Sequence, residues 1–188
     1  MRCLGLLGAV WLFATPASAQ GFEKDVIPTS AGDLSITLVG HGTLLFDIGG
    51  KTIHVDPWSK LADYATLPKA DLILITHSHG DHLDPAAIAT IRKPETQVIA
   101  APECEGKIDG ALILPNGEKK VLLGVEIAAV PAYNLVHQRS EGVPFHPKGQ
   151  GNGYLLSFGD TRVYVAGDTE NTPEMKALEN VAVAFLPM

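Results

Sequence analysis

A short apolar run followed at once by a cluster of histidines is the feature that most constrains the fold of this chain. Residues 71–76 read Asp-Leu-Ile-Leu-Ile-Thr, and His77-Ser-His79-Gly-Asp81-His82 comes directly after them. A continuous apolar run of this length is typical of a buried strand. A helix would point residues i and i+2 apart, whereas a strand end and a tight loop let the four polar side chains converge. The pattern therefore predicts a site on a loop at the end of a buried strand.

The residue types of this cluster indicate a metal site. Imidazole nitrogens and carboxylate oxygens are the ligands that Zn²⁺, Mn²⁺ and Fe²⁺ accept. Gly80 leaves space at the crowded centre of the loop and permits a positive φ angle. Histidines packed this tightly in sequence are rarely a solvated loop. We expect one or two bound ions, zinc first, with Mn²⁺ or Fe²⁺ as alternatives.

The rest of the chain predicts many short strands and few helices in one domain, as its 188 residues suggest. Residues 34–55 favour a meander of antiparallel strands, with a tight turn at Gly49-Gly50. We expect strands at 34–39, 43–48, 52–55, 71–76, 97–101, 120–123, 125–130, 154–158, 162–165 and 181–186. Helices are expected after an Asp84 cap, over 85–91, and at 173–178, while 131–150 is expected to be irregular.

The N-terminus has the layout of a secretory signal peptide. Arg2 precedes an apolar stretch at 3–14, and Ala17-Ser18-Ala19 is a small-x-small cleavage site. We expect cleavage after Ala19 and a mature domain over 20–188 that is periplasmic or secreted. The apolar stretch is shorter than the roughly 20 residues of a membrane span, so no stable membrane insertion is expected, although an uncleaved anchor is the alternative.

Composition narrows the other possibilities. The formal net charge is −7 and no run of Lys or Arg forms a basic stripe, which argues against nucleic-acid binding. Cys104 is the only cysteine left after removal of the signal peptide. It is expected to be a free, partly buried thiol, because no spacing supports a ligand role.

Several motifs together resemble the metallo-β-lactamase superfamily. The His-x-His-x-Asp-His run after an apolar strand is similar to its signature, and Val165-Ala-Gly-Asp-Thr169 is similar to its second Gly-Asp motif. Val39-Gly-His-Gly-Thr43 and Val55-Asp-Pro-Trp58 resemble the opening of the family. Pro131–Asn134 and Phe145–Lys148 resemble the lactonase-like and phospholipase D-like hydrolases. The resemblance implies an α/β fold, an αββα sandwich with helices outside two packed sheets.

The resemblance also implies the ligands of a first metal. These are His77, His79 and a third histidine between residues 131 and 153. His146 is preferred because it precedes the strand at 154–158 by a short glycine-rich loop, much as the family's ligand does. His137 is the alternative.

For a second metal the resemblance implies Asp81 and His82, with Asp168 bridging both ions. A further histidine near the C-terminus normally completes this second site in the family. No histidine follows His146 here, and the apolar strand runs straight to Met188. We therefore expect a domain that is incomplete at its C-terminus and a second site that is only partly supplied.

The implied activity is hydrolysis of a small-molecule ester, lactone or phosphodiester by a metal-activated hydroxide. Asp81 and Asp168 are the candidate catalytic groups, which orient the nucleophile and pass a proton to the leaving group. Two alternatives remain open: an iron-dependent, oxygen-using enzyme of the same fold, and a metal-binding protein without catalysis. The oligomeric state is not defined by the sequence.

The residues around the cluster have open roles. His41, between two glycines, is as readily a substrate contact or a support for the ligands as an unrelated loop residue, and His54 is expected to be packed. Asp56 either accepts a hydrogen bond from a ligand histidine or caps a turn.

Four further side chains fall on loops predicted near the site. Trp58 and Tyr133 either wall a pocket or pack beneath a loop. Arg139 and Lys148 either pair with an anionic substrate or are solvated.

Overall fold

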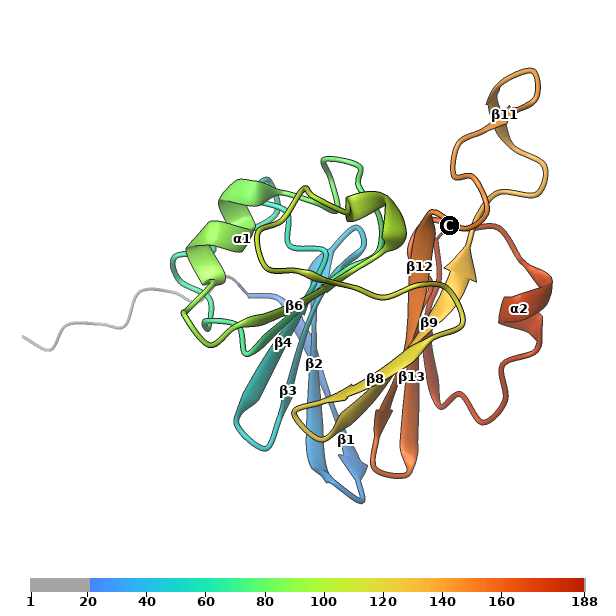
Figure 1. The fold of residues 1–188 in the computed structure, drawn as a ribbon. Coiled ribbons are helices and arrows are strands. Elements are labelled where there is room, and N and C mark those ends of the chain that lie inside the picture. Colours follow the sequence, from blue (N-terminus) through green and yellow to red (C-terminus); the bar gives the residue numbers. More distant parts are fainter. Residues whose placement is uncertain (1–20, 188) are drawn as a thin grey trace, which may run out of the picture.

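Two β-sheets packed face to face form the body of the molecule (Figure 1). The structure is a computed structural model and describes residues 21–187. The first sheet follows the order β1 to β7, and the second follows the order β14-β13-β12-β9-β8. A separate hairpin, β10–β11, projects beyond the ends of β9 and β12 in the second sheet.

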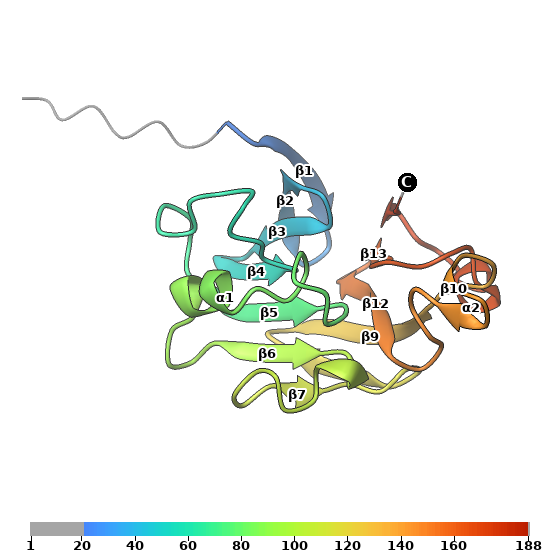
Figure 2. The ribbon, with the colours of Figure 1, turned by 90° about the horizontal axis from the view of Figure 1, so that it is seen from above.

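The first sheet is a meander that continues into parallel strands. It consists of β1 (Glu23–Thr29), β2 (Gly32–Gly40), β3 (Thr43–Ile48), β4 (Lys51–Val55), β5 (Leu72–Ile75), β6 (Gln97–Ala100) and β7 (Leu112–Ile113). Strands β1 to β4 pair antiparallel, which confirms the meander predicted over residues 34–55, and β4 to β7 pair parallel. Strands β2, β4, β5 and β6 therefore run in one direction, and their carboxyl ends meet at the same edge (Figure 2).

The second sheet and the helices complete the layers. The second sheet consists of β8 (Lys119–Leu122), β9 (Val125–Ala132), β12 (Gly151–Phe158), β13 (Thr161–Val165) and β14 (Val183–Phe185). The hairpin is β10 (Gln138–Ser140) with β11 (Val143–Pro144), and the helices are α1 (Pro85–Ile91), α2 (Pro173–Lys176) and the 3₁₀ turn η1 (Pro102–Cys104).

Three apolar clusters hold these layers together. The largest lies between the sheets and joins residues such as Phe46 and Leu72 of the first to Tyr154 of the second. Ile88 of α1 packs on the outer face of the first sheet. Met175 of α2 packs on the outer face of the second. Helices thus cover the outer face of each sheet, and the predicted αββα sandwich is confirmed.

The predicted cap of α1 is confirmed. The Oδ1 atom of Asp84 accepts hydrogen bonds from the backbone N–H groups of Ala86 and Ala87, at 2.9 and 3.2 Å. Pro85 occupies the first turn, where no N–H partner is needed. The helix α2 likewise begins after Thr172 but ends at Lys176, two residues earlier than predicted.

Several segments differ from the prediction. Strand β1 was not expected, because it is an edge strand that is largely exposed and has no apolar alternation. The segment 131–150 is not wholly irregular, since β9 extends to Ala132 and the hairpin lies within it. The strand expected at 181–186 is not buried: β14 covers 183–185 at the sheet edge, and Ala184 is exposed. It pairs only with β13, so its other edge has no partner strand among residues 21–187.

The signal peptide predicted at 1–19 lies outside the described residues. Within residues 21–187, no helix has both the length and the apolar character that a membrane crossing requires.

Candidate metal centre

The histidine cluster lies on a loop that is fixed at both ends. Strand β5 ends at Ile75, and the backbone then turns so that the N–H groups of His82 and Leu83 both donate to the carbonyl of His79, at 3.0 and 2.7 Å. The backbone N–H of Ser78 donates to Oε1 of Glu103 at 2.8 Å. These bonds hold the loop at the sheet edge, as the pattern of a buried strand followed by polar residues predicts.

A first group of ligating atoms forms around His77. Its Nε2 lies 3.1 Å from Nδ1 of His79, which in turn lies 3.2 Å from Nε2 of His146. The Oδ2 atom of Asp168 lies 3.6 Å from Nε2 of His146 and 3.9 Å from Nε2 of His77. All four side chains offer an atom within 4.8 Å of the others, which is a spacing that suits one metal ion.

A second group lies beside the first. It contains His82, Asp81 and His41, whose ligating atoms are also within 4.8 Å of one another. Nε2 of His82 lies 4.0 Å from Oδ2 of Asp81, and Nε2 of His41 lies 2.9 Å from the same oxygen. Of these three residues, only His82 is buried.

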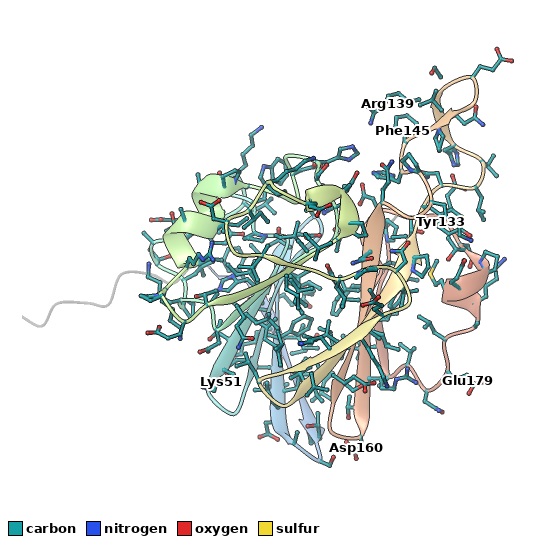
Figure 3. All side chains as sticks on the ribbon, viewed as in Figure 1. Lys51, Tyr133, Arg139, Phe145, Asp160 and Glu179 are labelled. Atoms are coloured by element: carbon teal, nitrogen blue, oxygen red, sulfur yellow. The ribbon has the colours of Figure 1, made fainter. Side chains whose placement is uncertain are left out.

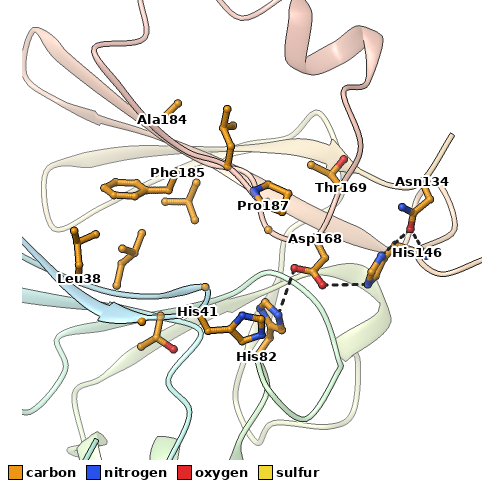
Figure 4. A pocket seen from close by; sticks show the side chains of 17 residues that line it. Leu38, His41, His82, Asn134, His146, Asp168, Thr169, Ala184, Phe185 and Pro187 are labelled. Carbon is orange, nitrogen blue, oxygen red and sulfur yellow. Dashed lines mark hydrogen bonds and ion pairs between the residues drawn. The ribbon is translucent and has the colours of Figure 1, made fainter. Parts of the chain in front are cut away.

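Asp168 lies between the two groups (Figure 4). Its Oδ1 is 3.5 Å from Nε2 of His82, whereas its Oδ2 faces His146 at 3.6 Å. The residue follows β13 through Gly167, whose φ of 63° turns the chain toward the site. This placement is what the predicted bridging ligand requires.

One buried atom in particular fits a bound metal. Nε2 of His82 is buried and has no hydrogen-bond partner, while Nδ1 of the same ring donates to Oδ2 of Asp56 at 2.8 Å. A neutral imidazole that carries its hydrogen on Nδ1 presents a lone pair at Nε2. Leaving that lone pair buried without a partner is unfavourable unless a cation binds it. The donor set therefore fits a divalent metal ion.

Asp56 supports both groups. Its Oδ2 also accepts from Oγ1 of Thr76 at 2.6 Å, and that hydroxyl lies 3.0 Å from Nδ1 of His77. When the Thr76 hydroxyl donates to Asp56, it accepts from Nδ1–H of His77 and leaves Nε2 of His77 free to bind metal. Of the two roles open for Asp56, the hydrogen bond to a histidine of the cluster is present, and it extends through Thr76 to a second histidine.

The pKa values of His77 and His146 favour the neutral, ligating form. Burial, followed by the charges of the neighbouring imidazoles, lowers the pKa of His77 to about 2. Burial also lowers the pKa of His146. For His82, burial acts in the same direction, but the hydrogen bond to Asp56 and the nearby carboxylates outweigh it and raise the pKa.

The structure separates the two candidates for the third histidine. His146 lies in the first group, where Oδ1 of Asn134 accepts its backbone N–H at 2.9 Å and lies 2.8 Å from its Nδ1. His137 lies on the exposed part of the same loop, with Nδ1 2.6 Å from Oε1 of Glu170. The geometry thus brings His146 to the cluster and not His137, and the ligand roles themselves stay predictions.

Sequence reasoning missed the two residues that shape this loop, Asn134 and Glu170. The Glu170 carboxylate accepts backbone N–H groups of Leu135, Val136 and His137, each at 2.8 Å. These hydrogen bonds, the one from His137 first, lower the pKa of Glu170 strongly. The position of Glu170, two residues after Asp168, is the only sequence signal that marks it.

His54 and Cys104, which lie outside the cluster, are packed in the core. His54 is buried in β4 and its Nε2 lies 3.0 Å from the carbonyl of Pro68, so the packed role is as predicted. Cys104 is fully buried rather than partly buried, because it packs in the apolar cluster between α1 and the first sheet, and burial raises its pKa to about 12.

The aromatic and cationic residues predicted near the site have different roles. The Trp58 ring lies 5.4 Å from that of His41, at the rim of the site. Tyr133 is buried and donates its hydroxyl to Glu174, so it packs beneath the loop. Lys148 pairs with the same Glu174 at 2.7 Å, which makes it unavailable to a substrate.

Arg139 is available where Lys148 is not. It lies on β10, above the site and beside Phe145 (Figure 3), with Nη2 3.4 Å from Nε2 of His79. No ion pair among residues 21–187 involves Arg139. Its charge therefore faces the metal centre without a carboxylate partner.

A cavity of about 750 Å³ opens onto the cluster (Figure 4). His41, His82, His146 and Asp168 line its polar end, and side chains such as Leu38 and Phe185 line its apolar end. Such a combination of an apolar wall with a few convergent polar groups is typical of a small-molecule site.

Known proteins are similar to this chain in sequence and in fold. Residues 35–188 match the model of a family described as "Beta-lactamase superfamily domain". A "UPF0173 metal-dependent hydrolase" of Thermococcus kodakarensis is 32% identical over 168 residues, which cover 82% of this chain and 72% of that protein. Another of the same description, from Thermodesulfovibrio yellowstonii, is 33% identical and is covered over 64% of its length. A crystal structure of a candidate metal-dependent hydrolase from Parabacteroides distasonis is 46% identical, with a TM-score of 0.84 over 89% of this chain and 76% of that one.

Proposed function

The chain belongs to the metallo-β-lactamase superfamily, and on that premise we propose that it is a metal-dependent hydrolase of an ester, lactone or phosphodiester. The observation that carries the proposal is the position of Asp168 between two groups of ligating side chains. One carboxylate that faces both groups suits a paired-ion site. The names of the relatives, which are metal-dependent hydrolases, support the same reaction class.

The side chains of the two groups have distinct roles in this reaction. His77, His79, His146 and Asp168 would hold a first ion, and Asp81, His82 and Asp168 would hold a second. Such ions, when bound, lower the pKa of water toward about 7 and stabilise negative charge on a carbonyl or phosphoryl oxygen. Asp81 and Asp168 are partly exposed, so their carboxylates can orient the attacking water and take up its proton.

Among these substrate classes, the unpaired guanidinium of Arg139 favours an anionic one. Arg139 extends over His79 from the hairpin, while Lys148, the other cation of this loop, is neutralised by Glu174. A guanidinium binds phosphate oxygens with paired N–H donors. We therefore place a phosphodiester before a neutral lactone.

The reaction class can be tested with the metal-loaded full chain. Bis-(p-nitrophenyl) phosphate, a γ-lactone and a p-nitrophenyl ester serve as probes, and turnover is expected with the phosphodiester. The double variant His77→Ala/His79→Ala should lose the first ion, by elemental analysis, and all turnover. His137→Ala should keep both, as a matched histidine outside the cluster. A wild-type chain that binds metal but hydrolyses none of the three probes would refute hydrolysis and favour a non-catalytic metal protein.

The substrate preference has its own test. Arg139→Gln should raise KM for the phosphodiester about tenfold or more and leave the lactone unaffected, because only the anion loses a charged partner. Arg139→Lys should restore part of the loss. Equal effects on the charged and the neutral substrate would contradict a charge-recognition role.

We also propose that the protein is exported and acts in the periplasm or outside the cell. The layout of residues 1–19 supports this proposal. Cell fractionation and N-terminal sequencing test it: the mature chain should begin at Gln20 and appear outside the cytoplasm. An intact Met1 on a cytoplasmic protein would refute it.

A further inference from the structure

We propose that His41 is a ligand of the second metal ion, together with Asp81, His82 and Asp168. The inference rests on the proposed metal centre and completes its second half. Among the residues of this chain, the resemblance to the family assigns Asp81, His82 and Asp168 to this ion, and in the family a histidine near the C-terminus normally completes the site. His41 comes from the turn between β2 and β3, about 40 residues before the signature loop, and no motif marks it as a ligand.

The first reason is geometric. His41, Asp81 and His82 each offer one ligating atom within 4.8 Å of the others, and Oδ2 of Asp81 lies 2.9 Å from Nε2 of His41 and 4.0 Å from Nε2 of His82. Oδ1 of Asp168 lies 3.5 Å from Nε2 of His82, so the second group together with Asp168 can offer four atoms. The first group also offers four atoms, three nitrogens and one oxygen. Zinc in proteins binds four ligands in a tetrahedral arrangement, so His41 brings the second group to the same number.

The second reason is the backbone at His41. Its φ angle is 50°, in the left-handed region that non-glycine residues rarely adopt. Residues held in such conformations concentrate at functional sites, because the surrounding structure must fix them there. The flanking Gly40 and Gly42 allow the turn to fold back over the site. A Cβ at Gly42 would lie 2.9 Å from Cε1 of His82, so the turn packs directly on that ring.

The third reason is the position of the ring. The His41 ring lies between Trp58, at 5.4 Å, and His82, at 5.1 Å between centroids. The two neighbours direct Nε2 toward Asp81 and the cavity that opens onto the cluster. The side chain is 41% exposed, so an incoming ion reaches Nε2 without a rearrangement of the core.

A simpler role for His41 would be to donate a hydrogen bond from Nε2 to Asp81. The two roles make opposite demands on a substitute. Glutamine at position 41 donates a hydrogen bond to Asp81 but is a poor zinc ligand, whereas glutamate is a zinc ligand that has no hydrogen to donate. Both side chains reach about as far as Nε2 of histidine, and both share the backbone strain, so their difference reports the ligand role alone.

The experiment is a titration of the metal-stripped full chain with Zn²⁺ alone, followed by calorimetry and by elemental analysis after desalting. The wild type should bind two ions. His41→Gln should keep the first ion and bind the second more than about 100-fold more weakly, since even residues that only support ligands cost 10–100-fold. His41→Glu should retain the second ion. Retention of the first ion shows that each variant is folded, and His137→Gln is the matched control with two ions.

The possible results separate this inference from the proposed function. If His41→Gln binds both ions like the wild type, or if it retains the second ion better than His41→Glu, His41 is not a ligand. A wild type that binds a single ion also overturns the ligand role of His41, but leaves the hydrolase proposal standing on the first group. A wild type that binds no zinc overturns both.

Discussion

Replacing Asp56 with asparagine should weaken both halves of the metal centre at once. The carboxylate of Asp56 accepts three hydrogen bonds: Oδ1 from the Thr76 backbone N–H at 2.8 Å, and Oδ2 from the Thr76 hydroxyl at 2.6 Å and from Nδ1 of His82 at 2.8 Å. Asparagine has the same shape and tolerates the φ of 44° found here, so the backbone has no reason to move. Only the pattern of donors and acceptors changes.

Asparagine cannot satisfy all three donors. If its NH₂ group replaces Oδ1, it faces the Thr76 N–H, and a buried donor without an acceptor costs about 1–3 kcal/mol. If it replaces Oδ2, Nδ1 of His82 must become an acceptor, which moves the hydrogen of that ring to Nε2. Through Thr76, the same change moves the hydrogen of His77 to Nε2. Each histidine would then present a hydrogen where it should present a lone pair.

The expected result is a loss of affinity for both ions of roughly 10–100-fold, which is about 1.4–2.7 kcal/mol per ion. Zinc titration of the stripped protein measures it, and urea unfolding without metal measures the accompanying loss of stability. Asp71→Asn is the matched control. Asp71 accepts the Thr52 backbone N–H at 2.9 Å and Lys93 Nζ at 2.7 Å, and takes no part in either group of ligating side chains.

The control should lose stability and bind zinc like the wild type. Two results would contradict the prediction: Asp56→Asn binds both ions with wild-type affinity, or its affinity is lowered for only one ion. In the first case the ring tautomers are not set by Asp56. In the second, the path through Thr76 to His77 does not exist.

Three other predictions test separate features. His146→Ala should lower zinc affinity at the first site far more than His137→Ala, and the reverse order would show that the wrong histidine was chosen. Gly167→Ala should lower the free energy of unfolding by about 1–3 kcal/mol, because a Cβ there lies 2.9 Å from a neighbouring side-chain carbon. Gly149→Ala, which has positive φ but open space, should cost less in the same urea experiment. Burial lowers the pKa of His54 from its usual 6.5 to about 4. The free energy of unfolding should therefore be unaffected by this histidine above pH 6.5 and should fall by up to about 3 kcal/mol as the pH falls toward 4. His54→Gln should flatten that part of the pH–stability curve, and an unchanged curve would refute the assignment.

The local parts of the centre were predictable from the sequence. The signature loop follows β5 directly, so its spacing alone brings His77, His79 and His82 to one place. The strands of the core were predictable for a similar reason, since runs such as 43–48 and 72–75 are almost wholly buried and apolar. Strand β1 was not predicted, because the charged Glu23-Lys24-Asp25 segment is an exposed edge without an apolar pattern.

The distant parts of the centre depend on tertiary structure. His146 reaches the cluster because Asn134 and Glu170 shape the loop between β9 and β12, and neither contact has a local pattern. His41 reaches it because β2 and β4 run in the same direction on either side of β3 and so end at the same edge. A sequence shows that a histidine lies in a turn, but strand pairing decides which edge of the sheet that turn occupies.

The residues with positive φ angles at the centre lie just after the ends of strands. His41 follows β2, Asp56 follows β4 and Gly167 follows β13 by two residues, with φ angles of 50°, 44° and 63°. At each point a chain leaving a sheet must turn back so that a side chain faces the metals. Glycine would relieve the strain at His41 or Asp56, but it would remove a ligating or orienting side chain. The fold therefore retains two strained, non-glycine residues at this edge, and the hydrogen bonds around Asp56 are what hold one of them in place.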